Sequence, residues 1–328
     1  MRPQVLAAVL TLTAGGLVAA APEAPRFAFP IDCVTGRTCE IQNYVDRDPG
    51  PGVLDYRCQH RTYQGHDGVD IRIPDMAAQA RGVTVLAAAP GRVANVRDGV
   101  ADVSVRKIGE AAVNGIGCGN AVSIDHGGGW ISGYCHMAKG SVRVKPGDVV
   151  ATGQPLGRVG LSGLTEFPHL HFVVRHDGKV VDPFAPGPIS PGACSPQAGM
   201  WTPQAAREMA YKAGAILNIG LSGVAVTAES LEAGGVPAAT AASPVMAVYG
   251  RVIGAQAGDE IEATLTGPGG TVLATRRLAP LPRDQAQYFY MVGRKRPATG
   301  WAKGAYAGDF RVWRGGQAVM ARRVAVTF

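Results

Sequence analysis

Three short segments concentrate residue types that can bind a metal ion or transfer a proton. They hold four of the seven histidines and span residues 65–71, 133–137 and 168–172. In the third segment, His169 and His171 are two residues apart, so on a β-strand both side chains point to the same face. Leu170 and Phe172 then point the opposite way, into a core. By itself this His-x-His pair is weak evidence, because an accidental or structural origin accounts for it equally well.

The first segment adds a second pair of possible ligands. His66 and Asp70 are four residues apart and flank a glycine, which permits a tight bend. Imidazole and carboxylate groups both bind zinc, and catalytic zinc sites typically use three protein ligands and leave a fourth position for water. His66, Asp70 and one histidine of the 169/171 pair would supply such a set. The combination of segments is much more specific than either pair alone.

These segments together resemble the signature of the lysostaphin-like (LytM-type) zinc endopeptidases. The resemblance covers about residues 60–185 in the order of that family, and it includes the flanking segments 119–127, 144–157, 159–163 and 168–183. It implies one Zn²⁺ per chain, bound by His66, Asp70 and His171. It also implies that His136 and His169 lie beside the metal and act on the water and the developing oxyanion. The activity implied is hydrolysis of peptide bonds in peptidoglycan cross-links or stem peptides.

One departure from the family pattern affects the substrate groove. Many relatives have Thr-Gly-Pro or Ser-Gly-Pro before the His-x-His pair, whereas this chain has Glu166-Phe167-Pro168. The change alters the wall of the groove and therefore bears on substrate preference. The residues that correspond to the family's metal ligands are all present.

Other interpretations of the same residues stay open. Some family members lack ligands and activate other wall enzymes, so a non-catalytic, zinc-containing regulator is the alternative function. A protein substrate is a third possibility, because the zinc chemistry does not depend on the source of the amide. Upstream, Asn43, Asp46 and Asp48 either block the fourth zinc position or form turns. Asp67 adjoins a ligand, but on an extended chain it is expected to point elsewhere.

The pattern of elements predicts an all-β protein. Short apolar or alternating runs separated by glycine turns fill residues 66–187, which favours an antiparallel sheet as the peptidase domain. Residues 21–65 are expected to be irregular, and the proline-rich stretch 188–203 is expected to be a linker. Beyond a short helix near 204–211, regularly spaced strands predict a small β-sandwich over 204–328. That domain either binds wall polymer or acts as a packing partner.

Composition and charge narrow the class of protein. Hydrophobic residues make up 46% and charged residues 17%, which excludes a disordered chain. The net charge of +7 fits an anionic partner such as the cell wall, and peptidoglycan is the expected partner. Nucleic acid is not an expected partner, since no Lys/Arg-rich run occurs.

The N-terminus and the cysteines both indicate export. Residues 1–20 have a positive Arg2, an apolar stretch and small residues at 18–20, which is the pattern of a cleaved signal peptide. An uncleaved anchor is the alternative; both place the body of the chain in the periplasm, envelope or medium, with no stable membrane span after cleavage. Six cysteines in an exported chain suggest disulfides. The pairings we favour are Cys118–Cys135, Cys33–Cys39 and Cys58–Cys194.

Overall fold

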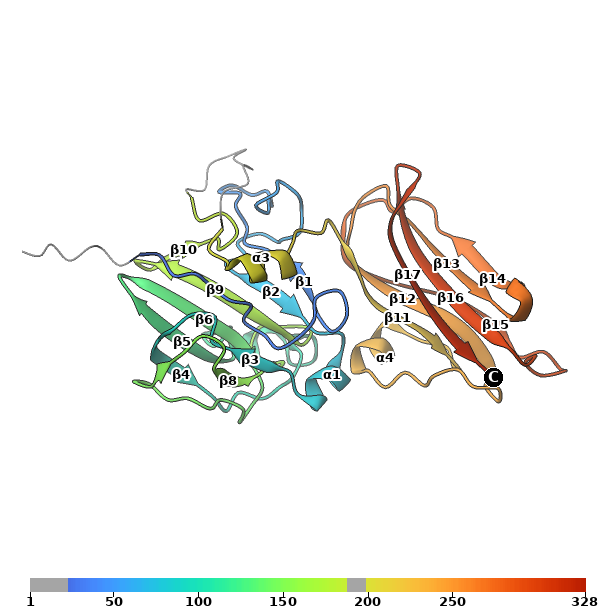
Figure 1. The fold of residues 1–328 in the computed structure, drawn as a ribbon, viewed down its shortest axis with the longest axis horizontal. Coiled ribbons are helices and arrows are strands. Elements are labelled where there is room, and N and C mark those ends of the chain that lie inside the picture. The colour runs from blue at the N-terminus through green and yellow to red at the C-terminus, as the bar shows by residue number, and fades with distance from the viewer. Residues whose placement is uncertain (1–22, 188–198) are drawn as a thin grey trace, which may run out of the picture.

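The computed structural model describes residues 23–187 and 199–328, and it places two β-bodies side by side (Figure 1). Every strand pairing is antiparallel in the two bodies, which confirms the predicted all-β class. The expected signal peptide, 1–20, and most of the expected linker lie outside the described residues. None of the helices over the described residues has the length and apolarity that a membrane crossing needs.

The larger sheet of the first body carries the residues of interest. Its strand order is β1-β2-β9-β6-β5-β4-β7, and β10 also pairs with β9. The strands are β1 (Glu40–Asn43), β2 (Val69–Arg72), β4 (Gly91–Arg97), β5 (Asn120–Gly127), β6 (Trp130–Met137), β7 (Val149–Val150), β9 (His169–His176) and β10 (Lys179–Val181). Strand β9 lies between β2 and β6, so its side chains meet neighbours from both sides.

Smaller elements complete the first body. Strands β3 (Thr84–Leu86) and β8 (Pro155–Arg158) form a two-stranded sheet. The helices are short: α1 (Met76–Arg81), α2 (Val105–Ile108), η1 (Glu110–Val113) and α3 (Pro203–Glu208). The short helix expected near 204–211 corresponds to α3.

The core of the first body lies under the inward face of the large sheet. On β9, Leu170, Phe172 and Val174 are almost completely buried, as the two-residue period of a strand predicts. The ring of Phe172 contacts Phe27 and Trp201. Phe27, which precedes the sheet, and Trp201, which lies inside the expected linker 188–203, therefore pack into the same core as the strands, so the described end of that stretch is part of the first body.

The N-terminal segment is not wholly irregular. Strand β1 pairs with β2 at the edge of the large sheet, where Asn43 lies opposite Asp70. All four residues of β1 are buried. The local sequence Glu-Ile-Gln-Asn has only one apolar residue, so pairing with β2, rather than a hydrophobic pattern, gives this segment its strand conformation.

The second body is a β-sandwich with one short helix, α4 (Ala228–Ala233), and a turn of 3-10 helix, η2 (Pro268–Gly270). One sheet has the order β11-β12-β15 and the other β14-β13-β16-β17. The strands are β11 (Ala215–Ser222), β12 (Val245–Ala255), β13 (Glu260–Thr266), β14 (Val272–Arg277), β15 (Gln285–Lys295), β16 (Ala305–Arg314) and β17 (Gln317–Thr327). Val248, Ile261 and Phe310 are fully buried in the core of this body.

A buried ionic cluster joins the two bodies. Arg72 of β2 has no exposed side-chain surface, and it forms an ion pair with Glu232 of α4. Glu232 also pairs with Arg251 of β12, and Arg251 donates a hydrogen bond to the carbonyl of Pro74. Helix α4 thus supplies the negative charge that compensates a buried cation of the first body (Figure 1).

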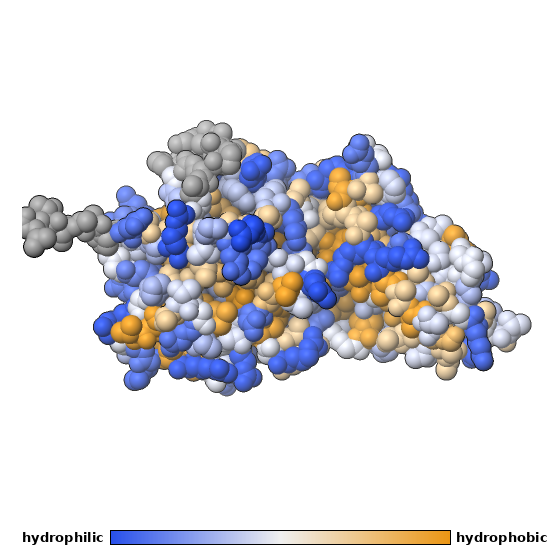
Figure 2. Space-filling view, in the orientation of Figure 1, coloured by the Kyte–Doolittle hydropathy of each residue, from blue (hydrophilic) through white to orange (hydrophobic). Residues whose placement is uncertain are grey.

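Two of the expected disulfides are present, Cys33–Cys39 and Cys118–Cys135. The third pairing involves Cys194, which lies outside the described residues. On the face seen in Figure 2, hydrophilic side chains are interspersed with small hydrophobic areas across both bodies.

Candidate metal centre

The strand pairing brings the three chemical segments together. Asp70 of β2 is paired with His171 of β9, and Cys135 of β6 is paired with His171 from the other side. His136 follows Cys135 at the end of β6, and His66 precedes β2. All five residues predicted from the sequence, His66, Asp70, His136, His169 and His171, therefore gather on the outward face of one sheet.

Three donor atoms converge in a geometry suited to zinc. His66 Nε2 lies 3.1 Å from Asp70 Oδ1 and 3.2 Å from His171 Nδ1, and the last two atoms are 2.9 Å apart. Ligands at zinc-binding distances of 2.0–2.2 Å in a tetrahedron lie about 3.3 Å from one another. The nitrogen and carboxylate donors of this set thus fit a zinc ion without rearrangement of the backbone.

Hydrogen bonds to the far side of two ligands orient them. His66 Nδ1 lies 2.6 Å from the carbonyl oxygen of Tyr44. Because a carbonyl only accepts, this nitrogen carries the proton and leaves the lone pair on Nε2, which faces the other ligands. His171 has the opposite orientation, since its Nε2 lies 3.1 Å from Asp67 while Nδ1 faces the site. Such outer contacts fix the tautomer and ring orientation of metal-binding histidines.

A hydrogen bond from a neighbouring side chain also orients Asp70. The side-chain amide of Asn43 donates to Asp70 Oδ2 at 2.8 Å, which leaves Oδ1 directed at the histidines. Asn43 is thus close to the metal centre, but its hydrogen bond runs to a ligand. Asp46 and Asp48 accept backbone N–H groups of Gly65 and Gly50, the role of turn-forming residues.

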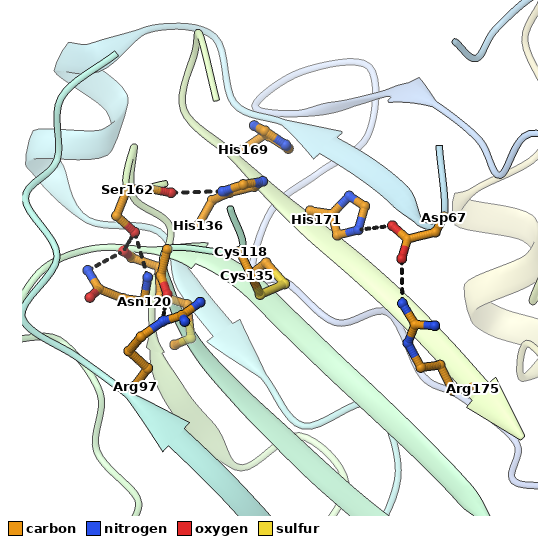
Figure 3. Close-up of a disulfide and its surroundings, with 12 residues drawn as sticks. Asp67, Arg97, Cys118, Asn120, Cys135, His136, Ser162, His169, His171 and Arg175 are labelled. Atoms are coloured by element: carbon orange, nitrogen blue, oxygen red, sulfur yellow. Dashed lines mark hydrogen bonds and ion pairs between the residues drawn. A yellow bond between two sulfur atoms is a disulfide. The ribbon is translucent and has the colours of Figure 1, made fainter. Parts of the chain in front are cut away.

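The two remaining histidines, His136 and His169, lie beside the candidate ligand His171 (Figure 3). His136 Nδ1 donates to the carbonyl of Ser162 at 2.8 Å, and His169 Nδ1 donates to the carbonyl of Phe167 at 2.9 Å. Both Nε2 atoms are therefore free to accept a proton, and that of His169 lies 3.3 Å from Asp70 Oδ1. His136, His169 and His171 form a second set of clustered donors that shares His171 with the first, so both sets describe one site.

Burial and charge set the protonation of the site. Burial, helped by the charges of His169 and His171, holds the pKa of His136 well below its ordinary value, so this ring is neutral at pH 7. Burial alone would raise the pKa of Asp70, but the neighbouring His66 and His169 outweigh it and hold that pKa well below its usual range. The carboxylate is therefore ionised, as a metal ligand must be.

His136 has an unusual backbone that its surroundings impose. Its φ angle is +60°, in the left-handed region that non-glycine residues rarely adopt. Its N–H donates to the carbonyl of Cys118 at 2.8 Å, and its neighbour Cys135 is joined to Cys118 by the disulfide. Strained residues of this kind persist where the surrounding structure over-determines them. The disulfide and the hydrogen bond together fix the position of the imidazole.

A groove of about 550 Å³ runs past these residues. Its lining includes the disulfide, His136 and His171, and charged residues at its two sides: Asp67, Arg97 and Arg175. Figure 3 shows Arg97 and the Asp67–Arg175 pair on opposite sides of the disulfide.

Sequence reasoning missed the outer contacts. Asp67 was expected to point away from the metal, but its carboxylate contacts His171 and forms an ion pair with Arg175. Strand β2 begins only at Val69, so the alternation expected of an extended chain does not apply at residue 67. The carbonyl of Tyr44 leaves no trace in a sequence pattern, since any residue type has one.

Comparisons with known proteins identify relatives of the segment that carries these residues. The family model described as "Peptidase family M23" matches residues 64–183. The chain is 32% identical over 125 residues to Cell division protein DipM of Caulobacter vibrioides, which covers 38% of this chain and 17% of that protein. It is 33% identical over 118 residues to Outer membrane antigenic lipoprotein B of Histophilus somni, covering 36% of this chain and 28% of that protein.

Among solved structures, the chain is similar to a catalytic-domain variant of the prophage-encoded M23 protein EnpA from Enterococcus faecalis. The identity is 25%, the match covers 48% of this chain and 93% of that chain, and the TM-score is 0.32. The chain spans less than a third of the length of these curated relatives. The residues matched by the family model include all five clustered residues. Residues 64–183 form a lysostaphin-like (LytM-type) domain of peptidase family M23.

Proposed function

We propose that this chain is an exported zinc metalloendopeptidase that hydrolyses peptide bonds of peptidoglycan. The observation that carries the proposal is the convergence of His66 Nε2, Asp70 Oδ1 and His171 Nδ1 within 3.2 Å, with two further histidines beside them. A regulator that had lost catalysis would not need to retain all five side chains. Location in the cell envelope is part of the proposal, and the name of the Histophilus somni relative supports it.

The three ligands would hold one Zn²⁺, and His66 and Asp70 are already ordered for it by Tyr44 and Asn43. When bound, zinc supplies a Lewis acid that activates water near neutral pH and polarises the scissile carbonyl. Because His66 and Asp70 are almost fully buried, bulk water screens their interaction with each other only weakly. The site is therefore preorganised for a reaction in which negative charge develops on oxygen.

Proton transfer is assigned to His136 and His169. Each ring donates through Nδ1 to a backbone carbonyl, so Nε2 is the atom that accepts a proton from water and returns it to the leaving amine. His136 is neutral at pH 7, so the lone pair of its Nε2 is available as an acceptor, while the same burial makes the ring a weaker base than a free imidazole. The backbone positions of both residues are fixed. Strand pairing holds His169, and the adjacent Cys118–Cys135 disulfide and the hydrogen bond from its N–H to Cys118 hold His136.

The test compares zinc content and peptidoglycan digestion in four proteins: wild type, His66→Ala, His169→Ala and the control His176→Ala. His176 is on the same strand as His169, but its side chain is 41% exposed and remote from the ligands. We expect one zinc and activity in wild type and control, loss of both in His66→Ala, and a zinc-loaded His169→Ala that is roughly 10²–10⁴-fold slower.

Other outcomes would redirect the proposal. Wild-type protein that binds no zinc would overturn the site itself. Zinc binding without cleavage of purified peptidoglycan or casein would favour the regulator, and cleavage of casein alone would indicate a protein substrate. The proposed boundaries, with a signal peptide at 1–20 and a sandwich over 204–328, are tested by N-terminal sequencing of the exported protein and by limited proteolysis.

A further inference from the structure

The charges in the groove do not balance. Asp67 and Arg175 form an ion pair with 2.6 Å between Oδ2 and Nη2, so each neutralises the other. The remaining charged side chain of the lining, apart from the histidines, is Arg97. Over the described parts of the chain, no carboxylate lies within ion-pair distance of Arg97, so its positive charge has no partner in the protein.

Arg97 is nevertheless held in a defined position. It ends strand β4 and is half-buried. Its Nε donates a hydrogen bond to the carbonyl of Gly119, which fixes the plane of the guanidinium and leaves the two terminal nitrogens available. Ordering an arginine costs side-chain entropy, and here that cost is already met before any ligand arrives.

The row of strand pairs relates Arg97 to the metal centre. Arg97 is paired with Ala121 of β5, Ala121 lies opposite the Cys135 region of β6, and Cys135 is paired with His171. Neighbouring strands are about 4.8 Å apart, so three strand spacings separate Arg97 from His171 by roughly 14 Å. An extended peptide advances about 3.3 Å per residue. Arg97 is thus about four residues of bound peptide away from the scissile bond.

We propose that Arg97 binds a carboxylate of the substrate, so that the enzyme prefers acidic peptides whose free carboxylate lies a few residues from the cleaved bond. The inference rests on the proposed peptidase function and names its substrate class. A guanidinium with two free terminal nitrogens is the group best suited to a carboxylate, because its fork matches the two oxygens. The overall net charge of +7 favours the same class of ligand.

The experiment uses a cross-linked muropeptide with free carboxylates, and the same muropeptide after carbodiimide-mediated conversion of these groups to carboxamides. We expect amidation to lower kcat/KM of the wild type roughly 10- to 100-fold, mainly through KM, which is the effect of losing one charge-assisted hydrogen-bonded pair. Arg97→Gln should lose the same factor on the free carboxylate and cleave both substrates equally. Arg97→Lys should keep part of the preference, since it keeps the charge.

Arg92→Gln is the matched control, because Arg92 is an exposed arginine on the same strand that bonds to Gly147 and does not line the groove. It should behave as the wild type. The proposal is overturned if Arg97→Gln still discriminates between the two muropeptides, or if it loses the same factor on both. Circular dichroism and zinc content of each variant exclude loss of folding as the cause.

Failure of the proposed function gives a different result. If the wild type cleaves neither muropeptide, the peptidase proposal fails, and the role of Arg97 is then decided by calorimetric titration of the free-carboxylate muropeptide. The carboxylate subsite is supported if the free-carboxylate muropeptide binds more tightly to the wild type than to Arg97→Gln and if amidation of the muropeptide removes this difference. Equal binding to both proteins overturns it.

Discussion

Replacement of Glu232 by glutamine should show how strongly the second body supports the first. The carboxylate of Glu232 pairs with Arg72, which has no exposed side-chain surface, and with Arg251, which is 4% exposed. Burial lowers the pKa of Arg72 to about 9 even though Glu232 opposes this effect. Without Glu232, two neighbouring guanidinium groups would remain buried with no counter-charge.

Breaking a buried ion pair by removing one partner costs about 3–5 kcal/mol. Glu232 is 21% exposed, so water can reach the cluster in part, and we expect the lower end, about 3 kcal/mol. For domains of this size the thermal midpoint should fall by roughly 6–12 °C. The measurement is differential scanning calorimetry at pH 7, with exposed Glu229→Gln on the same helix as the control.

The substitution should also affect catalysis while zinc stays bound. The guanidinium of Arg72 lies 3.9 Å from the ring centre of Phe167, whose carbonyl accepts the Nδ1 proton of His169. Release of Arg72 would loosen this support, so kcat should fall more than zinc content. Glu232→Asp should restore part of both effects. A thermal midpoint of Glu232→Gln within about 2 °C of the wild type would refute the reasoning.

Three further predictions concern the first body. Asn43→Ala should weaken zinc binding about tenfold in a chelator competition, because Asp70 loses its orienting hydrogen bond; a rise in activity at saturating zinc would instead indicate a blocking role. Burial raises the pKa of Asp182 to about 6, so the folded state holds its proton more tightly and stability falls as pH rises from 4 to 6. In urea unfolding, the free energy of unfolding of the wild type should fall by about 3 kcal/mol over this pH range, and that of Asp182→Asn should lack this fall. Replacing Cys118 and Cys135 by serine should lower the free energy of unfolding by about 3 kcal/mol, and an unchanged urea midpoint would contradict this.

Local patterns predicted the strand that carries two of the site residues. His169 and His171 share a face of β9, and Leu170 and Phe172 are buried on the other, because alternation is a property of a single extended segment. Burial does not follow such alternation on every strand. Along β11, Leu217, Ile219 and Leu221 alternate with less apolar residues, yet both faces are buried at the two ends of the strand, because packing in the tertiary structure decides burial there.

The contacts that orient the candidate ligands could not be predicted from local sequence patterns. Tyr44, Asn43 and Asp67 orient His66, Asp70 and His171, and each reaches its partner only after distant segments have paired. A carbonyl has no sequence signature, and the direction of Asp67 depends on where β2 begins. Such contacts are set by strand register and by the path of the chain between strands.

The sequence by itself determined which chemistry to expect of this protein, since the types and spacing of a few residues point to a metal, a reaction class and a compartment. Only the tertiary structure decided how that chemistry is held in place. The pairing of β2 with β9 joins ligands a hundred residues apart, and Glu232 of the second body compensates Arg72 behind them. Residue type and period are local properties, whereas register and charge compensation between remote segments exist only once the whole chain has packed.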